Sequence, residues 1–204
     1  MTARRAAPVV PVWLRQLRAE PLRTRRLVIR PPRRGDDRLV YPAVRESMRD
    51  LSRWLVWATD AYDARTCRVF VRDAMRDYAT GRGFGLLMFT HGGAFVGGTG
   101  FHVRGASARY YEIGYWCRSS MAGRGYTTEA VKALVRLAFT SPDVHRIEIR
   151  CDPRNRASAR VIRKCGFALE GRLRKIVRHH DGRLCDHLVF AKVRRARAQG
   201  KSRR

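Results

Sequence analysis

The sequence is poor in acidic residues and poorer still in lysine. Its 204 residues include 44 Lys and Arg against 17 Asp and Glu, a formal net charge of +27, and only five of the basic residues are lysine. This excess has two interpretations, which the sequence leaves open. A basic surface attracts anionic partners such as RNA, the ribosome or phosphorylated cofactors. Alternatively, the chain simply uses arginine where other proteins use lysine, as a compositional preference without a function.

Other absences limit the compartment and the class of site. The five cysteines are odd in number and include no Cys-x-x-Cys pair, which argues against a disulfide framework or a zinc site and fits a reducing cytoplasm. The six histidines are scattered apart from one adjacent pair, so we expect no metal. No run of about 18 apolar residues is present, so we expect no membrane span. The basic N-terminus is interrupted by Pro8 and Pro11 and is a poor secretory signal.

What is present predicts an α+β fold with a mixed, mostly antiparallel sheet flanked by helices. Apolar residues recur first with helical spacing, then with strand alternation, and then with both in turn. The expected elements are a strand from 25, helices over 36–49 and 63–78, strands at 84–90, 94–103 and 109–117, a helix from 128, a strand at 145–151, a helix from 156 and a hairpin about 181–182.

The same pattern predicts the division of the chain. We expect residues 1–20 to be a basic, loosely ordered extension, 21–193 to be the folded domain and 194–204 to be a basic tail. In the second helix, apolar residues three and four apart predict one buried stripe. Its members are Cys67, Phe70, Val71, Ala74, Met75 and Tyr78.

A short loop, "AGRGYT" at 122–127, lies directly before an apolar helical stretch. A helix N-terminus offers unpaired N–H groups and a partial positive charge. Gly123 and Gly125 would let the backbone approach a bulky anion closely, and Arg124 between them adds a full charge. The loop therefore favours a phosphate, and a pyrophosphate in particular. An ordinary tight turn is the alternative for so short a motif.

The context of this loop carries a family resemblance. The strand "YYEIGYWC", the loop "GRGYTTEA" and the later "DPRNRASARVIRKCGF" resemble the GNAT superfamily of acetyltransferases. The chain looks most like the RimJ/RimL branch, whose members acetylate protein N-termini, notably those of ribosomal proteins. The resemblance covers about 83–190, and "SRWLVWA" near Trp54 adds to it. The superfamily loop has Gln or Arg where this chain has Ala122, and Gly or Ala where it has Thr127, a departure that leaves the backbone donors in place.

The resemblance implies the acyl-CoA N-acyltransferase fold, acetyl-CoA as co-substrate and direct attack by the amine, without an acyl-enzyme or a metal. In such folds the strand before the loop splays from its neighbour, and Gly114 would suit a local bulge. The residues implied to bind the cofactor are Tyr115, Trp116, Cys117, Arg118, Gly123, Arg124, Gly125, Tyr126, Thr127 and Asn155. Cys117 is expected to serve packing and not to act as a nucleophile.

The resemblance also suggests catalytic residues. Glu112 is the candidate base, because a carboxylate in an aromatic strand is costly unless it is functional or paired; a solvent-facing Glu is the alternative. Ser158 is the candidate proton donor to the thiolate, although Asn155 and Ser158 are also good helix-capping residues. Some relatives place an acid near Ile176 and Val177, and this chain has none there.

The acceptor is the least determined part. Deprotonation at pH 7 costs about 1.2 kcal/mol for an α-amine and roughly 4.6 kcal/mol for lysine, so a single carboxylate fits an α-amine better. Trp54 and Trp57 are candidates to line the acceptor groove, with core packing as the alternative. The sequence therefore predicts transfer of acetyl to the N-terminal α-amine of a protein, such as a ribosomal protein beginning with Ser or Ala.

Two other functions stay open. One is acetylation of a small-molecule amine, and the other is a non-catalytic RNA- or ribosome-binding protein with the same fold. With the first function we also expect weak RNA or ribosome association through the basic surface, and a cytoplasmic location. The oligomeric state is left open.

Overall fold

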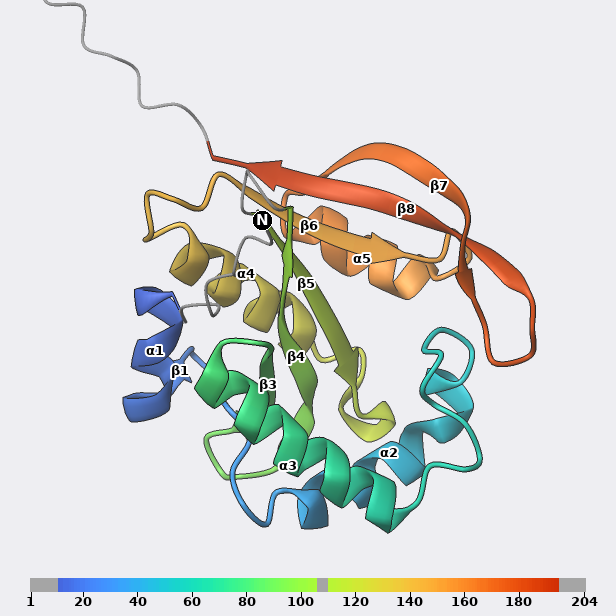
Figure 1. Cartoon of the computed structure of the whole chain (residues 1–204). Coiled ribbons are helices and arrows are strands. Elements are labelled where there is room, and N and C mark those ends of the chain that lie inside the picture. The colour runs from blue at the N-terminus through green and yellow to red at the C-terminus, as the bar shows by residue number, and fades with distance from the viewer. Residues whose placement is uncertain (1–10, 106–109, 195–204) are drawn as a thin grey trace, which may run out of the picture.

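The computed structural model describes residues 11–105 and 110–194. The strands are β1 Leu22–Arg23, β2 Leu27–Arg30, β3 Phe84–Thr90, β4 Phe95–Arg104, β5 Tyr110–Cys117, β6 Arg146–Cys151, β7 Ala168–Arg178 and β8 Leu184–Val193. Over the described residues they form one eight-stranded sheet in the order β1-β2-β3-β4-β5-β6-β8-β7 (Figure 1). Neighbouring strands are antiparallel except β5 and β6, which are parallel. The predicted mixed, mostly antiparallel sheet is confirmed.

Helices cover both faces of the sheet. They are α1 Val12–Ala19, α2 Asp37–Leu51, α3 Ala64–Thr80, α4 Tyr126–Ala138 and α5 Arg156–Lys164, with a short 3-10 turn η1 at Ser119–Met121. α2 and α3 pack on one face, and α1, α4 and α5 pack on the other (Figure 1). The predicted limits of α3 are nearly those observed, because Asp63 caps its start by accepting from the Thr66 N–H at 2.7 Å and left-handed Gly81 ends it.

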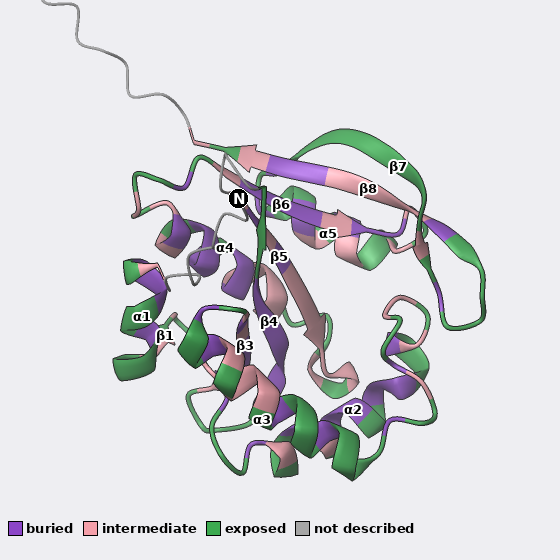
Figure 2. Ribbon diagram, in the orientation of Figure 1, coloured by how far each residue is buried: buried purple, intermediate pink, exposed green. Residues whose placement is uncertain are grey.

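The alternation of side chains along the central strands divides the core into two clusters, seen as buried ribbon on both sides of the sheet in Figure 2. On β5, Tyr111 and Ile113 are buried in the cluster beneath α1, α4 and α5. Trp116 packs instead against the cluster beneath α2 and α3. Because successive strand residues point to opposite faces, Glu112 and Gly114 share the face of Trp116. Side chains on that face of β5 therefore point toward α2 and α3.

The N-terminal segment differs from its prediction. A loosely ordered extension up to residue 20 is wrong for the described part, where α1 packs into the core with Trp13, Leu14 and Leu17 buried. The Tyr78 hydroxyl donates to the Leu14 carbonyl at 2.6 Å. Pro11 is the N-cap of α1, so it begins the helix and does not interrupt it. Residues 1–10, and 195–204 of the predicted tail, lie outside the described residues.

The predicted stripe on α3 is only partly buried. Cys67, Val71 and Tyr78 are buried as expected, but the side chain of Phe70 is 50% exposed. Phe70 lies at the lip of a cavity, so its apolar surface is turned toward a space and not into the core. The helical period alone could not separate these two environments.

Neither a membrane span nor a metal cluster is found in the described part of the chain. No helix within residues 11–105 and 110–194 is both long and apolar enough to cross a membrane. Across the same ranges, His, Cys, Asp and Glu side chains do not gather in threes that could hold a metal ion.

Candidate active site

β5 and β6 begin as a parallel pair and then separate. Their register pairs Tyr111 with Ile147 and Glu112 with Glu148, and beyond these positions the two strands diverge (Figure 1). Among the described strands, none pairs with residues 113–117 on the side of β6. The splaying expected before the glycine loop is confirmed. Backbone N–H and C=O groups on such an edge can bind an extended ligand.

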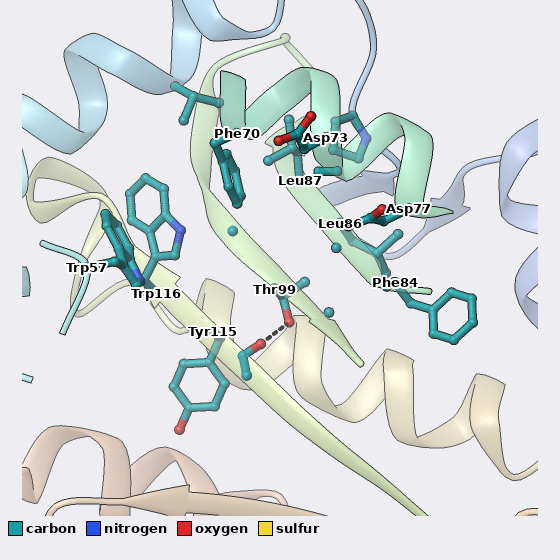
Figure 3. A pocket seen from close by; sticks show the side chains of 18 of the residues that line it. Trp57, Phe70, Asp73, Asp77, Phe84, Leu86, Leu87, Thr99, Tyr115 and Trp116 are labelled. Carbon is teal, nitrogen blue, oxygen red and sulfur yellow. Dashed lines mark hydrogen bonds between the residues drawn. The ribbon is translucent and has the colours of Figure 1, made fainter. Parts of the chain in front are cut away.

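The predicted bulge at Gly114 is wrong. β4 and β5 pair in unbroken register with Gly114 opposite Gly100, and the Thr99 hydroxyl donates to the Gly114 carbonyl at 2.9 Å (Figure 3). The glycine is explained by space, since a Cβ there would lie 3.2 Å from Nε2 of His102. A side chain at this position would have to displace the His102 ring.

The loop between β5 and α4 has the predicted glycine geometry. φ is +75° at Gly123 and +79° at Gly125, in the left-handed region that favours glycine. Gly125 is the N-cap of α4, and no side chain caps this helix. Its first N–H groups are therefore left for another acceptor, and the helix dipole adds partial positive charge there. A phosphate group fits this arrangement.

Arg26, just ahead of β2, holds the loop from one side. It donates to the Arg124 carbonyl at 2.9 Å, and its Nε pairs with Glu129 at 2.6 Å. Burial opposes ionisation of Glu129, but hydrogen bonds from Thr24 and Arg26 outweigh it and lower the pKa of this carboxyl. The Arg26 guanidinium also lies 4.7 Å from the centre of the Tyr126 ring. The first turn of α4 is thus tied to the start of the sheet.

α2 holds the loop from the other side. Glu46 accepts from Nε of Arg118 at 2.6 Å and from the Ser120 N–H at 2.9 Å. The N–H of Ser119 donates to the Ser47 hydroxyl at 2.9 Å. Hydrogen bonds from Arg118 and Ser120 lower the pKa of Glu46 to about 2, so it is ionised at neutral pH. Arg118, expected at the cofactor, is therefore anchored to α2.

A shallow basic hollow of about 410 Å³ adjoins the start of α4. Five cationic side chains line it together with Gly125, and Glu129 is the acid among its lining residues. The cations are Arg25, Arg26, Lys132, Arg136 and Lys164. Such a cluster raises the local potential for a phosphorylated ligand.

Two hydroxyls meet beside the splayed strands. Tyr115 from β5 and Ser158 from α5 lie with their oxygens 2.8 Å apart, and either can be the donor. Burial raises the pKa of Tyr115, so the phenol keeps its proton at neutral pH. Asn155 is the N-cap of α5, accepting from the Ser158 N–H at 2.9 Å. The capping alternative for Asn155 is therefore observed, and it orients the residue that carries the Ser158 hydroxyl.

Cys117, which ends β5, and Cys151, which ends β6, are held as thiols. Burial raises the pKa of Cys117 and of Cys151. Thiols that remain protonated are weak nucleophiles. This supports packing as the role of Cys117, which also has a side-chain hydrogen bond with Thr127.

Glu112 is paired and not solvent-facing. Its Oε2 lies 3.0 Å from Nε of Arg104 and 3.5 Å from Nε of Arg150, and the side chain is 15% exposed. Glu148 on β6 shares Arg150 and also pairs with Arg146. The carboxylate expected to be costly in this strand is thus compensated by two guanidinium groups.

A cavity of about 670 Å³ lies between the sheet and α3 (Figure 3). Gly85, Gly100 and Gly114 occupy paired positions on β3, β4 and β5, and this row of missing side chains leaves room above the sheet. Aromatic residues line the walls, and two acids and a histidine add polar groups. They are Trp57, Tyr62, Phe70 and Trp116, with Asp73, Asp77 and His102.

Of the two tryptophans proposed to line the acceptor groove, only one lines the cavity. Trp57 lines the cavity, with its ring centre 6.2 Å from that of Trp116 (Figure 3). Trp54 is half-buried on the same segment and does not line it. Three residues of spacing do not decide which side chain reaches the cavity, because the segment after α2 is a series of turns.

A family model described as "Acetyltransferase (GNAT) domain" matches residues 26–168. The chain belongs to the GNAT acetyltransferase family. It is 31% identical to the "Putative ribosomal N-acetyltransferase YdaF" of Bacillus subtilis over 143 residues, 67% of this chain and 76% of YdaF. It is 43% identical to the "Probable N-acetyltransferase YjcK" of the same organism over 89 residues, 44% of this chain. The chain thus spans about half the length of YjcK, 48%.

The fold matches solved GNAT structures. RimJ of Mycobacterium smegmatis, solved in complex with CoA-disulfide, superposes with a TM-score of 0.73 at 26% identity, covering 82% of this chain and 81% of that one. The expected acyl-CoA N-acyltransferase fold and the RimJ/RimL-like resemblance are therefore confirmed.

The GNAT pattern located one half of the site better than the other. The structure brings together the glycine loop, Tyr115 and Ser158 around the splayed strands. Trp116, expected at the cofactor, turns its side chain into the cavity on the opposite face. Sequence reasoning missed Arg26, Glu46 and His102, because their partners lie far along the chain or on a neighbouring strand. No signal in the sequence links Arg26 to Glu129, 103 residues away.

Proposed function

We propose that this chain transfers an acetyl group from acetyl-CoA to an amine by direct attack, and that the acceptor is the N-terminal α-amine of a protein. One observation carries the proposal: β5 leaves its parallel partner immediately before an uncapped helix start with two left-handed glycines. This places free main-chain groups for an extended arm next to free N–H groups for a diphosphate.

On the donor side, main-chain groups of Gly123, Arg124, Gly125, Tyr126 and Thr127 hold the diphosphate. The free edge of Tyr115, Trp116 and Cys117 holds the pantetheine arm, and Asn155 contacts it from α5. The basic hollow beside α4 attracts the phosphates. Arg118 acts through its pairing with Glu46, which positions the loop.

The reaction needs a neutral amine, a polarised carbonyl and a proton for the leaving thiolate. The amine first loses a proton to a base at the cavity. Its nitrogen then attacks the thioester carbonyl, so that a C–N bond forms and the C–S bond breaks. The Ser158 hydroxyl gives its proton to the thiolate and regains one from Tyr115, whose oxygen is 2.8 Å away. The second proton, which the nitrogen loses as it becomes an amide, passes through solvent and restores the Tyr115 hydroxyl. N–H groups on the free edge of β5 stabilise the developing oxyanion.

The cavity suits an amine that arrives as a cation. Asp73 and Asp77 line it and also pair with the exposed Arg72, Arg76 and Arg82, so they lower the positive potential at the cavity in a chain whose net charge is +27. The aromatic walls bury the first side chains of a peptide. The name of YdaF supports a ribosomal protein as acceptor. We propose that this acceptor begins with Ser or Ala and that the activity is cytoplasmic.

A small-molecule amine is the second candidate, favoured by the volume and aromatic lining of the cavity.

Incubating the protein with labelled acetyl-CoA and cell lysate, followed by mass spectrometry, distinguishes the two acceptors. Labelled protein N-termini support the proposal, and label confined to small amines favours the alternative. Calorimetry with acetyl-CoA alone tests the donor half. An absence of binding, together with tight and steeply salt-dependent RNA binding, would leave only the non-catalytic function.

A further inference from the structure

The imidazole of His102 lies in the acceptor cavity, whereas Glu112 does not line it. The two residues are directly opposite in the β4–β5 register. Nε2 of His102 is the atom nearest to where a Cβ on Gly114 would stand, at 3.2 Å, and Cδ2 follows at 3.7 Å. The ring therefore leans over the glycine that precedes Tyr115. Gly114, Tyr115 and Trp116 of the free stretch of β5 line the same cavity.

Glu112 is a poor candidate to take up a proton itself. Its Oε2 is shared by Arg104 at 3.0 Å and Arg150 at 3.5 Å, so the carboxylate is engaged by two guanidinium groups outside the cavity lining. A carboxylate held in this way is better suited to stabilise a neighbouring cation than to become neutral.

We propose that His102 takes the proton from the acceptor amine, with Glu112 behind it as the positioning residue that stabilises the imidazolium. This rests on the proposed acetyl transfer and replaces Glu112 as the base. The ammonium gives one proton to the imidazole, the neutral amine attacks the thioester, and the imidazolium later returns its proton to solvent. Glu112 keeps its charge throughout.

The surroundings of His102 favour the neutral, proton-accepting form. His102 is exposed by its surface area, but its enclosure by the neighbouring cavity walls lowers its pKa; Glu112 opposes this, and Arg104 on the same strand lowers the pKa further. Arg150 faces the pair from β6, and Asp73 and Asp77 line the same cavity from α3. Because the pKa lies below its ordinary value, the ring is mostly unprotonated at neutral pH. Activity should then fall on the acid side as the ring becomes protonated.

The test compares His102→Gln, Glu112→Gln and the exposed control His145→Gln, each as the full chain with a Ser-starting peptide and acetyl-CoA. We expect His102→Gln to lower kcat/KM by about 10²-fold or more and to remove the acid limb of its pH profile. Glu112→Gln should lower kcat/KM less and keep that limb, shifted to lower pH. His145→Gln should match the unmodified protein.

A second acceptor distinguishes proton transfer from a structural role. A peptide whose α-amine is replaced by an aminooxy group is unprotonated at neutral pH and needs no base. His102→Gln should therefore turn it over at nearly the rate of the unmodified protein. An equal loss with both acceptors, or an unchanged acid limb, would overturn the inference.

Failure of the proposed function would look different. It would show as an inability of the unmodified protein to bind acetyl-CoA by calorimetry or to acetylate either acceptor. If the unmodified protein and His102→Gln acetylate the peptide equally well, the role of His102 is refuted and the proposed acetyl transfer stands.

Discussion

At the scale of single residues, the glycines of this chain serve two different needs. Gly123 and Gly125 are required by backbone conformation, since both have positive φ. Gly85, Gly100 and Gly114 are aligned across three strands beneath the cavity, and at Gly100 a Cβ would lie only 2.4 Å from the Phe84 carbonyl oxygen on β3. The amino-acid composition does not distinguish these two groups of glycines, but substitutions should affect them differently.

We expect Gly123→Ala to weaken acetyl-CoA binding by about tenfold, because a left-handed alanine costs roughly 1–2 kcal/mol and the loop would shift to relieve it. Gly182→Ala is the matched control, since both glycines have positive φ and open space where a Cβ would stand. Calorimetry should show the loss for Gly123→Ala only. Equal affinities for the two variants would mean that the loop does not hold the donor.

Ser158→Ala should lower kcat by about tenfold or more with little change in acetyl-CoA affinity, because only the departing thiolate needs its proton. Ser141→Ala, just after α4, is the control. Steady-state kinetics with a Ser-starting peptide and calorimetry with acetyl-CoA measure the two quantities. A change confined to affinity would assign Ser158 to binding.

At the scale of elements, the glycine loop between β5 and α4 is held by contacts from distant parts of the chain. The Glu46 carboxylate on α2 reaches Arg118 and Ser120, and Arg26 ahead of β2 reaches Arg124. Neither contact is local in sequence. The loop is thus held in shape between two elements that precede it by many residues.

Because the pKa of Glu46 is lowered to about 2, its contribution to the loop is present above the ordinary carboxyl pKa and is lost as the pH falls from about 4.5 toward 2. Acetyl-CoA binding should therefore not respond to this group between pH 6 and 8. Glu46→Gln should raise the Kd several-fold across that range, whereas the exposed Glu20→Gln should not. Calorimetry at several pH values checks this, and equal Kd values for the two variants would refute the anchor.

α1 offers a test of stability at the same scale. Leu14 is fully buried and Val12 is 70% exposed on the same helix. We expect Leu14→Ala to lower the free energy of unfolding by about 2–5 kcal/mol, and Val12→Ala to change it by less than about 0.5 kcal/mol. Urea unfolding measures both. Equally small changes in the free energy of unfolding for both variants would indicate that α1 is a loosely attached extension.

At the scale of the whole molecule, the net charge of +27 acts together with a cavity that contains Asp73 and Asp77. Under the proposed function, the surface attracts acidic segments, while Asp73 and Asp77 lower the positive potential where the ammonium group enters. An acceptor with a free N-terminus followed by acidic residues satisfies both. This charge pattern also disfavours polycationic small amines.

A Ser-starting peptide with acidic residues after the third position should therefore have a lower KM than a neutral one. Its KM should rise as salt increases from about 50 to about 300 mM, because salt screens exposed charges over about a Debye length. Kinetics with the two peptides at both salt concentrations check this. If the KM of both peptides is independent of salt, the arginine excess does not contribute to acceptor binding, and the compositional interpretation is favoured.

The sequence by itself determined the sheet, most helices and the glycine loop, because these depend on local periodicity and backbone conformation. It also located Ser158 and the splayed strand through a contiguous motif. Only the tertiary structure decided that α1 joins the core, that His102 and not Glu112 lines the cavity between the sheet and α3, and that Trp57 lines it without Trp54. The reason is physical: which side chain meets a cavity depends on the facing of neighbouring strands and on packing by α2 and α3, and neither is encoded within a short window of residues.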